Sequence, residues 1–254
     1  MDYLTVEEAI HAPGLRLVLT AGVPGPWGEA AKAMLSYKGL AYTPVRQMGG
    51  EVNEALQTWT GQNSAPVLVP ESGPSVSHWM DLLLQCEELA PAKPLLPRDV
   101  DQRAMVLGLS ALLAGVNGFA WNRRLQMFAP AMRLESPPEV VARMAYKYGW
   151  SEAACAQAPA RMREICDALD SRLQKQEQVD SGYLVGASVT AVDFYWANFA
   201  GMIKPLAHAD NPMPSYMRET YQARDRELLD CVTPRLQAHR DMMYQHHITL
   251  PLDF

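Results

Sequence analysis

A β-turn-α-β unit near the start of the chain limits the fold more than any other feature. Residues 15–19 are a short run of mostly branched apolar residues, which predicts a strand, and residues 20–26 are rich in Gly and Pro, which predicts a turn. Apolar residues then recur at helical spacing over residues 27–38, and a second strand is predicted over residues 40–45. Because a helix connects the two strands, we expect them to be parallel, with a right-handed crossover.

Two residues help to place these elements. Gly39 is expected to end the helix, because glycine readily adopts the left-handed conformation found at helix ends. Pro44 has no N–H to donate, so the second strand is expected at a sheet edge. The other elements predicted before residue 90 are a short helix around residues 51–59, strands at 66–69 and 75–77, and a helix at 78–89.

The periodicity of the remaining chain is helical. Prolines at positions 91, 94 and 97 break the chain first, and clear helical patterns then cover residues 101–116, 162–173 and 228–243. We therefore predict an α/β domain at residues 1–90, a linker at residues 91–99 and an all-helical domain at residues 100–254.

Composition and charge exclude several classes of function. The formal net charge of −6, with no long basic run, argues against binding to nucleic-acid phosphates. No apolar stretch is expected to approach the roughly 20 residues that span a bilayer, and the first residues do not resemble a signal peptide. The four cysteines form no CxxC motif and no cluster with histidine, so neither a metal site nor a redox dithiol is expected. We expect a cytoplasmic protein without nucleic-acid or membrane partners.

A motif near residue 190 indicates the start of a buried helix. Thr190 and Asp193 have the spacing of a capping box, in which the hydroxyl accepts from one free helix amide and the acid reaches back to another. Bulky aromatic side chains follow at Phe194, Tyr195, Trp196 and Phe199. We expect this motif to act in folding rather than in chemistry.

Three segments, in this order along the chain, resemble those of cytosolic glutathione transferases. They are residues 37–40 (Tyr-Lys-Gly-Leu), residues 64–68 (Ser-Ala-Pro-Val-Leu) and residues 183–193, which include Thr190 and Asp193. The resemblance implies the glutathione-transferase fold, with a thioredoxin-like α/β N-terminal domain that binds glutathione and an all-α C-terminal domain. It also implies a homodimer that uses glutathione as co-substrate and needs no metal.

The resemblance places the cysteinyl part of glutathione against Ser64, Ala65 and Pro66. In the family this proline is cis, and the residue before it, here Ala65, turns its backbone N–H and C=O toward the tripeptide. The alternative is an ordinary trans proline that opens an edge strand.

Thiol activation is one point where the sequence departs from the family. A free thiol is only a few per cent ionised at about pH 7, so a transferase has to stabilise the thiolate. The family's Ser or Cys position falls on Gly25, which has no side chain, and Thr20 is the only hydroxyl near its Tyr position. Thr20 is therefore the candidate catalytic residue, and its alternative role is that of a threonine at a strand end. Amides at the helix start would favour a thiolate, and Trp27 would line its pocket.

The γ-glutamyl site is the second departure. The family holds this end of glutathione with a Glu-Ser pair, and His78 and Trp79 occupy the corresponding positions here, with Ser77 just before them. A shift of one residue would bring Ser77 into the first position but would turn Asp81 into the core. His78 is a candidate partner for a carboxylate, although a lone histidine is often structural or exposed.

The electrophile pocket is expected between the domains. A helix break within residues 115–124 would expose Trp121 and Arg124 to this cleft. The alternative is core packing for the aromatic residues and a surface position for the arginines. Residues 127–150 look like an enlarged insertion over the cleft, and their aromatic side chains suggest a broad apolar site.

The leading function is a glutathione-dependent transferase that conjugates or exchanges the glutathione thiolate with an apolar electrophile. The main alternative is a noncatalytic module of the same fold that binds a ligand or a protein, which Gly25 and the missing Glu-Ser pair favour. A glutaredoxin-like disulfide reductase is disfavoured, because residues 15–38 contain no cysteine.

Overall fold

A three-stranded sheet forms the centre of the first half of the chain. In the computed structural model, which describes residues 1–254, the strand order is β2-β1-β3. β1 (Arg16–Thr20) pairs in parallel with β2 (Thr43–Gln47) and antiparallel with β3 (Val67–Val69). The parallel pair confirms the predicted β-turn-α-β unit, and the place of β2 in the strand order confirms the edge position predicted from Pro44.

The strand predicted at residues 75–77 is wrong in extent. The structure has only one bridge there, between Val76 and Leu68. A turn at Gly73, where φ is +99°, precedes this bridge, and the next helix begins at Trp79. Too few extended residues therefore remain between the turn and the helix to form a ladder.

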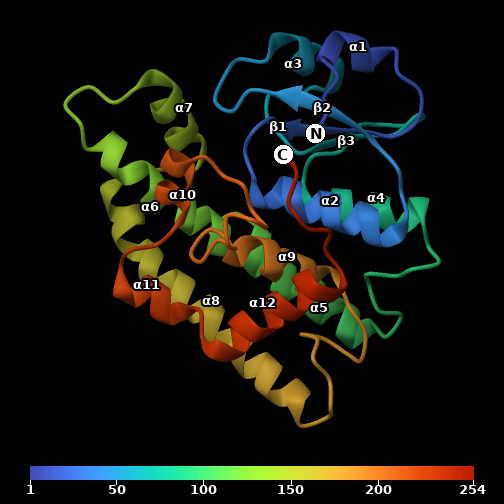
Figure 1. Ribbon diagram of the computed structural model, residues 1–254, viewed down its shortest axis with the longest axis vertical. Coiled ribbons are helices and arrows are strands. Elements are labelled where there is room, and N and C mark those ends of the chain that lie inside the picture. Colours follow the sequence, from blue (N-terminus) through green and yellow to red (C-terminus); the bar gives the residue numbers. More distant parts are fainter.

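Two pairs of helices cover the two faces of this sheet (Figure 1). One face carries α2 (Pro26–Lys38) and α4 (Trp79–Leu89), and the other carries α1 (Val6–Ile10) and α3 (Glu54–Thr60). Because side chains alternate along a strand, Leu17 and Leu19 of β1 pack with α2 and α4, while Val18 packs with α1 and α3.

Local sequence signals explain where two of these helices begin or end. α2 ends at Gly39, whose φ is +72°, as predicted. α1 is not among the predicted helices, although Thr5 and Glu8 form a capping box at its start. Its five residues are too few for a helical repeat of apolar positions to stand out.

The rest of the chain is helical, as expected from its periodicity. The helices are α5 (Val100–Ala114), α6 (Phe119–Met132), α7 (Glu139–Lys147), α8 (Glu152–Glu177), α9 (Ala191–Ala200), α10 (Ser215–Tyr221), α11 (Arg226–Cys231) and α12 (Pro234–His246). Every residue of α9 is buried, and α9 packs against α2, α5 and α12. One apolar core therefore extends from α2 and α4 of the first domain into the helical domain.

Asp193 organises the start of α9. Its carboxylate accepts the backbone N–H and the hydroxyl of Thr190, both at 2.8 Å, which joins the two residues of the predicted capping box. The same carboxylate accepts the N–H of Leu184 at 2.8 Å and contacts Nε2 of His239 at 2.8 Å. Asp193 thus links the start of α9 to the preceding loop and to α12.

We expected no apolar stretch long enough to span a bilayer, but the segment Val100–Met132 contains one. A part of it has a mean hydropathy of 1.6 and, by length and composition, could cross a membrane. The chain breaks between the two helices, however, so α5 has 15 residues and α6 has 14, fewer than the roughly 20 of a membrane span. Apolar side chains of both helices, such as Leu113 and Phe119, lie in the protein core.

Gly118 at this break leads to a prediction. A Cβ there would lie 2.7 Å from the carbonyl oxygen of Leu112 and 2.8 Å from that of Gly115, and backbone atoms cannot easily move away. We expect Gly118→Ala to lower the free energy of unfolding by about 1–3 kcal/mol. Gly108→Ala is the matched control, because it lies on the exposed side of α5 with nothing within 4 Å of an added Cβ.

The control should stabilise the protein by up to about 1 kcal/mol, because alanine favours a helix interior more than glycine does. Urea unfolding of both variants measures the difference. Equal stabilities of the two variants would contradict the packing argument at Gly118.

Candidate functional site

A cleft of about 560 Å³ lies between the sheet end of the first domain and helices of the second. Its walls come from the turn after β1, the loop after β2, the segment before β3, and helices α6 and α7. Eight of the residues that the sequence indicates line it: Thr20, Gly25, Trp27, Ser64, Ala65, Pro66, Trp121 and Arg124. These positions are far apart in sequence, and only the fold brings them to one cavity.

The Ala65–Pro66 peptide bond is cis, in agreement with the expectation from the family. Ala65 lies just outside β3, and neither its N–H nor its C=O has a hydrogen-bond partner within the protein. Both groups belong to a residue that lines the cleft. An extended peptide in the cleft could therefore pair with this backbone without displacing an internal hydrogen bond.

Ser64 connects the two domains across one end of the cleft. Its hydroxyl accepts a hydrogen bond of 2.7 Å from Nζ of Lys147, the last residue of α7. Burial lowers the pKa of Lys147. α7 also packs against the loop after β2, where a side chain at Gly50 would meet Val140.

Thr20 ends β1 and is the partner of Gln47 in the parallel register. Its hydroxyl oxygen accepts a hydrogen bond from Nε2 of Gln47, which is only 4% exposed. The Oε1 atom of Gln47 in turn accepts a hydrogen bond of 3.0 Å from Nδ2 of Asn53. The Thr20 O–H has no acceptor within the protein, so it is free to donate to a ligand in the cleft that Thr20 lines.

Gly25 and Trp27 lie at the start of α2. Gly25 is the N-cap residue and provides no side-chain hydrogen bond, and an added Cβ there would meet nothing within 4 Å. The Trp27 indole lines the cleft and donates a hydrogen bond of 2.9 Å to the carbonyl oxygen of Ala114, so it also joins the two domains. The free amides of the first turn of α2 favour an anion at this point.

The structure does not bring Ser77, His78 and Trp79 to the wall of this cleft. His78 is the N-cap of α4 and is exposed. The Trp79 side chain is 8% exposed and packs in the core between the domains, where its ring meets that of Tyr195 edge to face at 5.9 Å. Packing at the domain interface therefore explains why the Trp79 indole is buried.

An aromatic cluster forms the second wall of the cleft. Tyr148 lies at its centre, with ring centroids 4.6 Å from Trp121, 5.7 Å from Phe128 and 6.2 Å from Trp27. Burial raises the pKa of Tyr148, and this effect outweighs the opposite effect of the Arg124 charge. The helix break at residues 115–118 places Trp121 and Arg124 on the cleft side of α6, whereas Arg123 is buried in the helical domain rather than on the surface.

Two tyrosines near this wall are not among the residues selected from the sequence. Tyr148 follows the C-terminal end of α7, and its place among the aromatic residues of the predicted insertion is the only signal for it. Tyr221, at the end of α10, donates to the carbonyl oxygen of Pro24 at 3.4 Å and gives no sequence signal at all.

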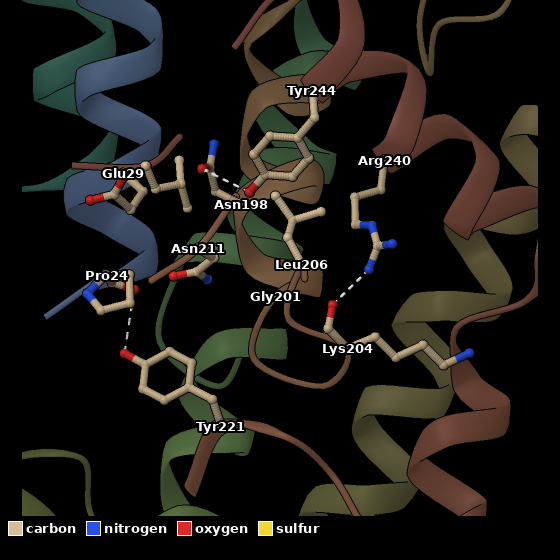
Figure 2. A pocket seen from close by; sticks show the side chains of 11 residues that line it. Pro24, Glu29, Asn198, Gly201, Lys204, Leu206, Asn211, Tyr221, Arg240 and Tyr244 are labelled. Atoms are coloured by element: carbon tan, nitrogen blue, oxygen red, sulfur yellow. Dashed lines mark hydrogen bonds between the residues drawn. The ribbon is translucent and has the colours of Figure 1, made fainter. Parts of the chain in front are cut away.

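A second, much smaller cavity lies beside Tyr221, between the start of α2 and the ends of α9 and α12 (Figure 2). Its volume of about 10 Å³ corresponds to no more than about one water molecule. Arg240 and Lys204 close it on one side, where Nη1 of Arg240 donates to the Lys204 carbonyl oxygen at 2.6 Å. This cavity is too small for an organic ligand. The cleft is the candidate site because the residues that the sequence indicates meet there.

No group of three or more His, Cys, Asp or Glu side chains lies close enough together to hold a metal ion. No sequence profile of a protein family matches the chain, and no curated protein matches it in sequence. Solved structures do match it.

A glutathione transferase family member from Pseudomonas fluorescens Pf-5, with two glutathione bound, is 13% identical, with a TM-score of 0.64 over 95% of this chain and 94% of that one. A glutathione S-transferase from Methylobacillus flagellatus KT with GSH bound is 15% identical, with a TM-score of 0.63 over 91% and 95%. Another, from Methylobacterium radiotolerans in complex with glutathione sulfonate, is 20% identical, with a TM-score of 0.58 over 86% and 94%. The chain has the glutathione-transferase fold.

This glutathione-transferase fold confirms the fold class expected from the three sequence segments. The matched structures cover both the sheet-containing and the helical part, so the likeness extends over nearly the whole chain. At these identities the likeness is one of fold, and the chemistry depends on the residues of the cleft.

Proposed function

We propose that this protein is a glutathione-dependent transferase that conjugates or exchanges the glutathione thiolate with an apolar electrophile. The observation that carries the proposal is the unpaired backbone of Ala65 at the wall of a cleft between the two domains. The matched structures from Pseudomonas fluorescens, Methylobacillus flagellatus and Methylobacterium radiotolerans, whose descriptions name glutathione or its sulfonate, support the same ligand here.

In this proposal the cysteinyl backbone of glutathione pairs with the N–H and C=O of Ala65. The thiol then points toward the turn after β1, where the Thr20 hydroxyl donates a hydrogen bond to it and the first amides of α2 add a favourable field. The thiol proton passes to solvent, and the thiolate sulfur attacks the electrophilic carbon. A carbon–sulfur bond forms while the leaving group departs with its electron pair.

The aromatic wall around Tyr148 holds the electrophile in this scheme. Trp121 is fixed in place by a hydrogen bond of 2.8 Å from its indole to the Tyr148 carbonyl oxygen. A rigid apolar wall orients a planar substrate against the thiolate, and orientation of this kind accounts for much of the rate in bimolecular reactions. A homodimer and a cytoplasmic location are parts of the same proposal.

The test is direct binding followed by turnover. We expect glutathione to bind in calorimetry and to raise the thermal unfolding temperature, and we expect an activated aryl halide to be conjugated faster than in buffer. A protein that neither binds glutathione nor accelerates the conjugation would overturn the proposal.

A noncatalytic glutathione-binding protein is the second candidate, and Gly25 is the observation that favours it. The residue at the family's Ser or Cys position has no side chain, so only Thr20 and backbone amides are left to stabilise a thiolate. Glutathione binding without any acceleration of conjugation would support this candidate over the first.

A further inference from the structure

Arg124 is a half-buried cation that has no anionic partner. It projects from α6 to the wall of the cleft, and no carboxylate lies within 4.0 Å of its guanidinium. One hydrogen bond of 3.2 Å runs from Nη2 to the hydroxyl of Tyr221, and the guanidinium lies 5.6 Å from the centroid of that ring. The Nε atom is buried and has no hydrogen-bond partner.

The surroundings of Arg124 add positive charge rather than balance it. Arg123, its neighbour in the chain, is buried and donates to the carbonyl oxygens of Met202 at 2.8 Å and Tyr221 at 3.0 Å. Burial, and then the charge of Arg124, lower the pKa of Arg123 to about 10. Arg143 and Lys147 also line the cleft, from α7.

The acidic residues of the cleft do not offset this charge. Glu29 is buried and is already paired with Lys32 at 2.9 Å. Glu51 lies in the exposed loop after β2. A charge that is partly withdrawn from water and has no partner is unfavourable, and such a group is expected where a ligand completes the pair.

The side chains around Arg124 indicate which kind of anion would bind there. A guanidinium matches a carboxylate through two parallel hydrogen bonds, and Arg124 lines a cleft whose wall also carries the aromatic rings of Trp121, Phe128 and Tyr148. A small inorganic anion would leave the rings of Trp121, Phe128 and Tyr148 without a partner. An apolar body that carries a carboxylate satisfies both the rings and the guanidinium.

We propose that the second substrate of this cleft is an aryl or similarly apolar electrophile that bears a carboxylate, held by Arg124. This inference rests on the proposed function, because it treats the aromatic wall as the second-substrate site. The Tyr221 hydroxyl, which accepts from Arg124, itself donates to Pro24 next to the start of α2. These two hydrogen bonds hold Arg124, and a carboxylate bound to it, in a fixed position relative to the start of α2, where the glutathione thiol is proposed to lie.

The experiment compares a chlorodinitrobenzoate with its methyl ester, each corrected for its uncatalysed reaction with glutathione. We expect the wild-type protein to have the higher kcat/KM for the acid. Arg124→Met should lower kcat/KM for the acid by about 10- to 100-fold, the loss of a charge-assisted pair, and should leave the ester within about twofold. The glutathione Kd should be unchanged.

Two further variants control for charge and folding. Arg133→Met removes the same charge from an exposed position at the end of the same helix and should leave both substrates unaffected. Arg124→Lys keeps the charge but not the planar fork, so its kcat/KM for the acid should lie between the wild type and Arg124→Met. Thermal unfolding of each variant verifies that it is folded.

The outcomes separate this inference from the proposed function. An equal loss of kcat/KM for acid and ester in Arg124→Met, or no preference for the acid in the wild type, would overturn the inference. Weaker glutathione binding by Arg124→Met would instead assign Arg124 to the glutathione site. If no turnover is seen at all, binding of dinitrobenzoate is followed by tryptophan fluorescence. Binding that Arg124→Met abolishes would then support the carboxylate site although the proposed transferase activity fails, and absence of binding would overturn both.

Discussion

Replacing Asp193 with alanine should lower the free energy of unfolding by about 3–5 kcal/mol, the usual effect of breaking a buried charged network. The Asp193 side chain is 0% exposed and accepts the N–H groups of Thr190 and Leu184 as well as the Thr190 hydroxyl. The variant leaves these donors unpaired and leaves His239, also buried, without its partner at 2.8 Å. Urea or thermal unfolding measures the loss.

Asp167→Ala is the matched control, because Asp167 is exposed in the middle of α8. We expect a change of less than about 0.5 kcal/mol there, as for most surface substitutions. Because α9 also packs against α2, the Asp193 variant should destabilise both domains together. A loss no greater than that of Asp167→Ala would show that the network at the start of α9 contributes little to stability.

Replacing Thr20 with valine should lower kcat/KM for conjugation by about 10- to 100-fold, because a hydrogen bond to a charged group contributes about 1.5–3 kcal/mol and each tenfold in rate corresponds to about 1.4 kcal/mol. In this variant the thiolate of bound glutathione loses the only side-chain hydroxyl placed at the end of β1. The pKa of the bound thiol, followed by thiolate absorbance, should therefore rise.

Thr20→Ser is the control, since it keeps the hydroxyl and the acceptor for Gln47. Its activity should stay within severalfold of the wild type. Gly25→Ser tests the same idea by gain of function: φ is −65° at Gly25 and a Cβ has open space, so a serine fits at the start of α2. This hydroxyl should restore part of the activity lost in Thr20→Val. Full activity of Thr20→Val would show that the hydroxyl has no role in thiol activation.

Several local features of this protein follow from its sequence. The strand and helix over residues 15–38 are marked by apolar spacing, and Gly39 ends the helix because its φ is positive. The start of α9 is marked by Thr190 and Asp193 because a capping box is made within four consecutive residues. The cis bond before Pro66 and the fold class follow from resemblance rather than from periodicity.

The candidate site depends mostly on tertiary structure. The resemblance placed Trp79 at the position of the family's Glu-Ser pair. Its indole lies buried between the domains, and position along the chain does not say which face of α4 meets α9. The hydrogen bonds from Asn53 to Gln47 and from Gln47 to Thr20 join different elements and have no sequence signature.

Arg124 is the clearest case of this division. Its sequence position permits either a surface or a cleft residue, and the packing of α6 against α10 and the turn before α2 decides the matter. Short-range signals such as apolar spacing, caps and turns therefore determined the local elements, and the resemblance of three segments indicated the fold class. Long-range packing determined which polar groups remain unpaired in the cleft, because burial and partners depend on residues that are distant in the chain.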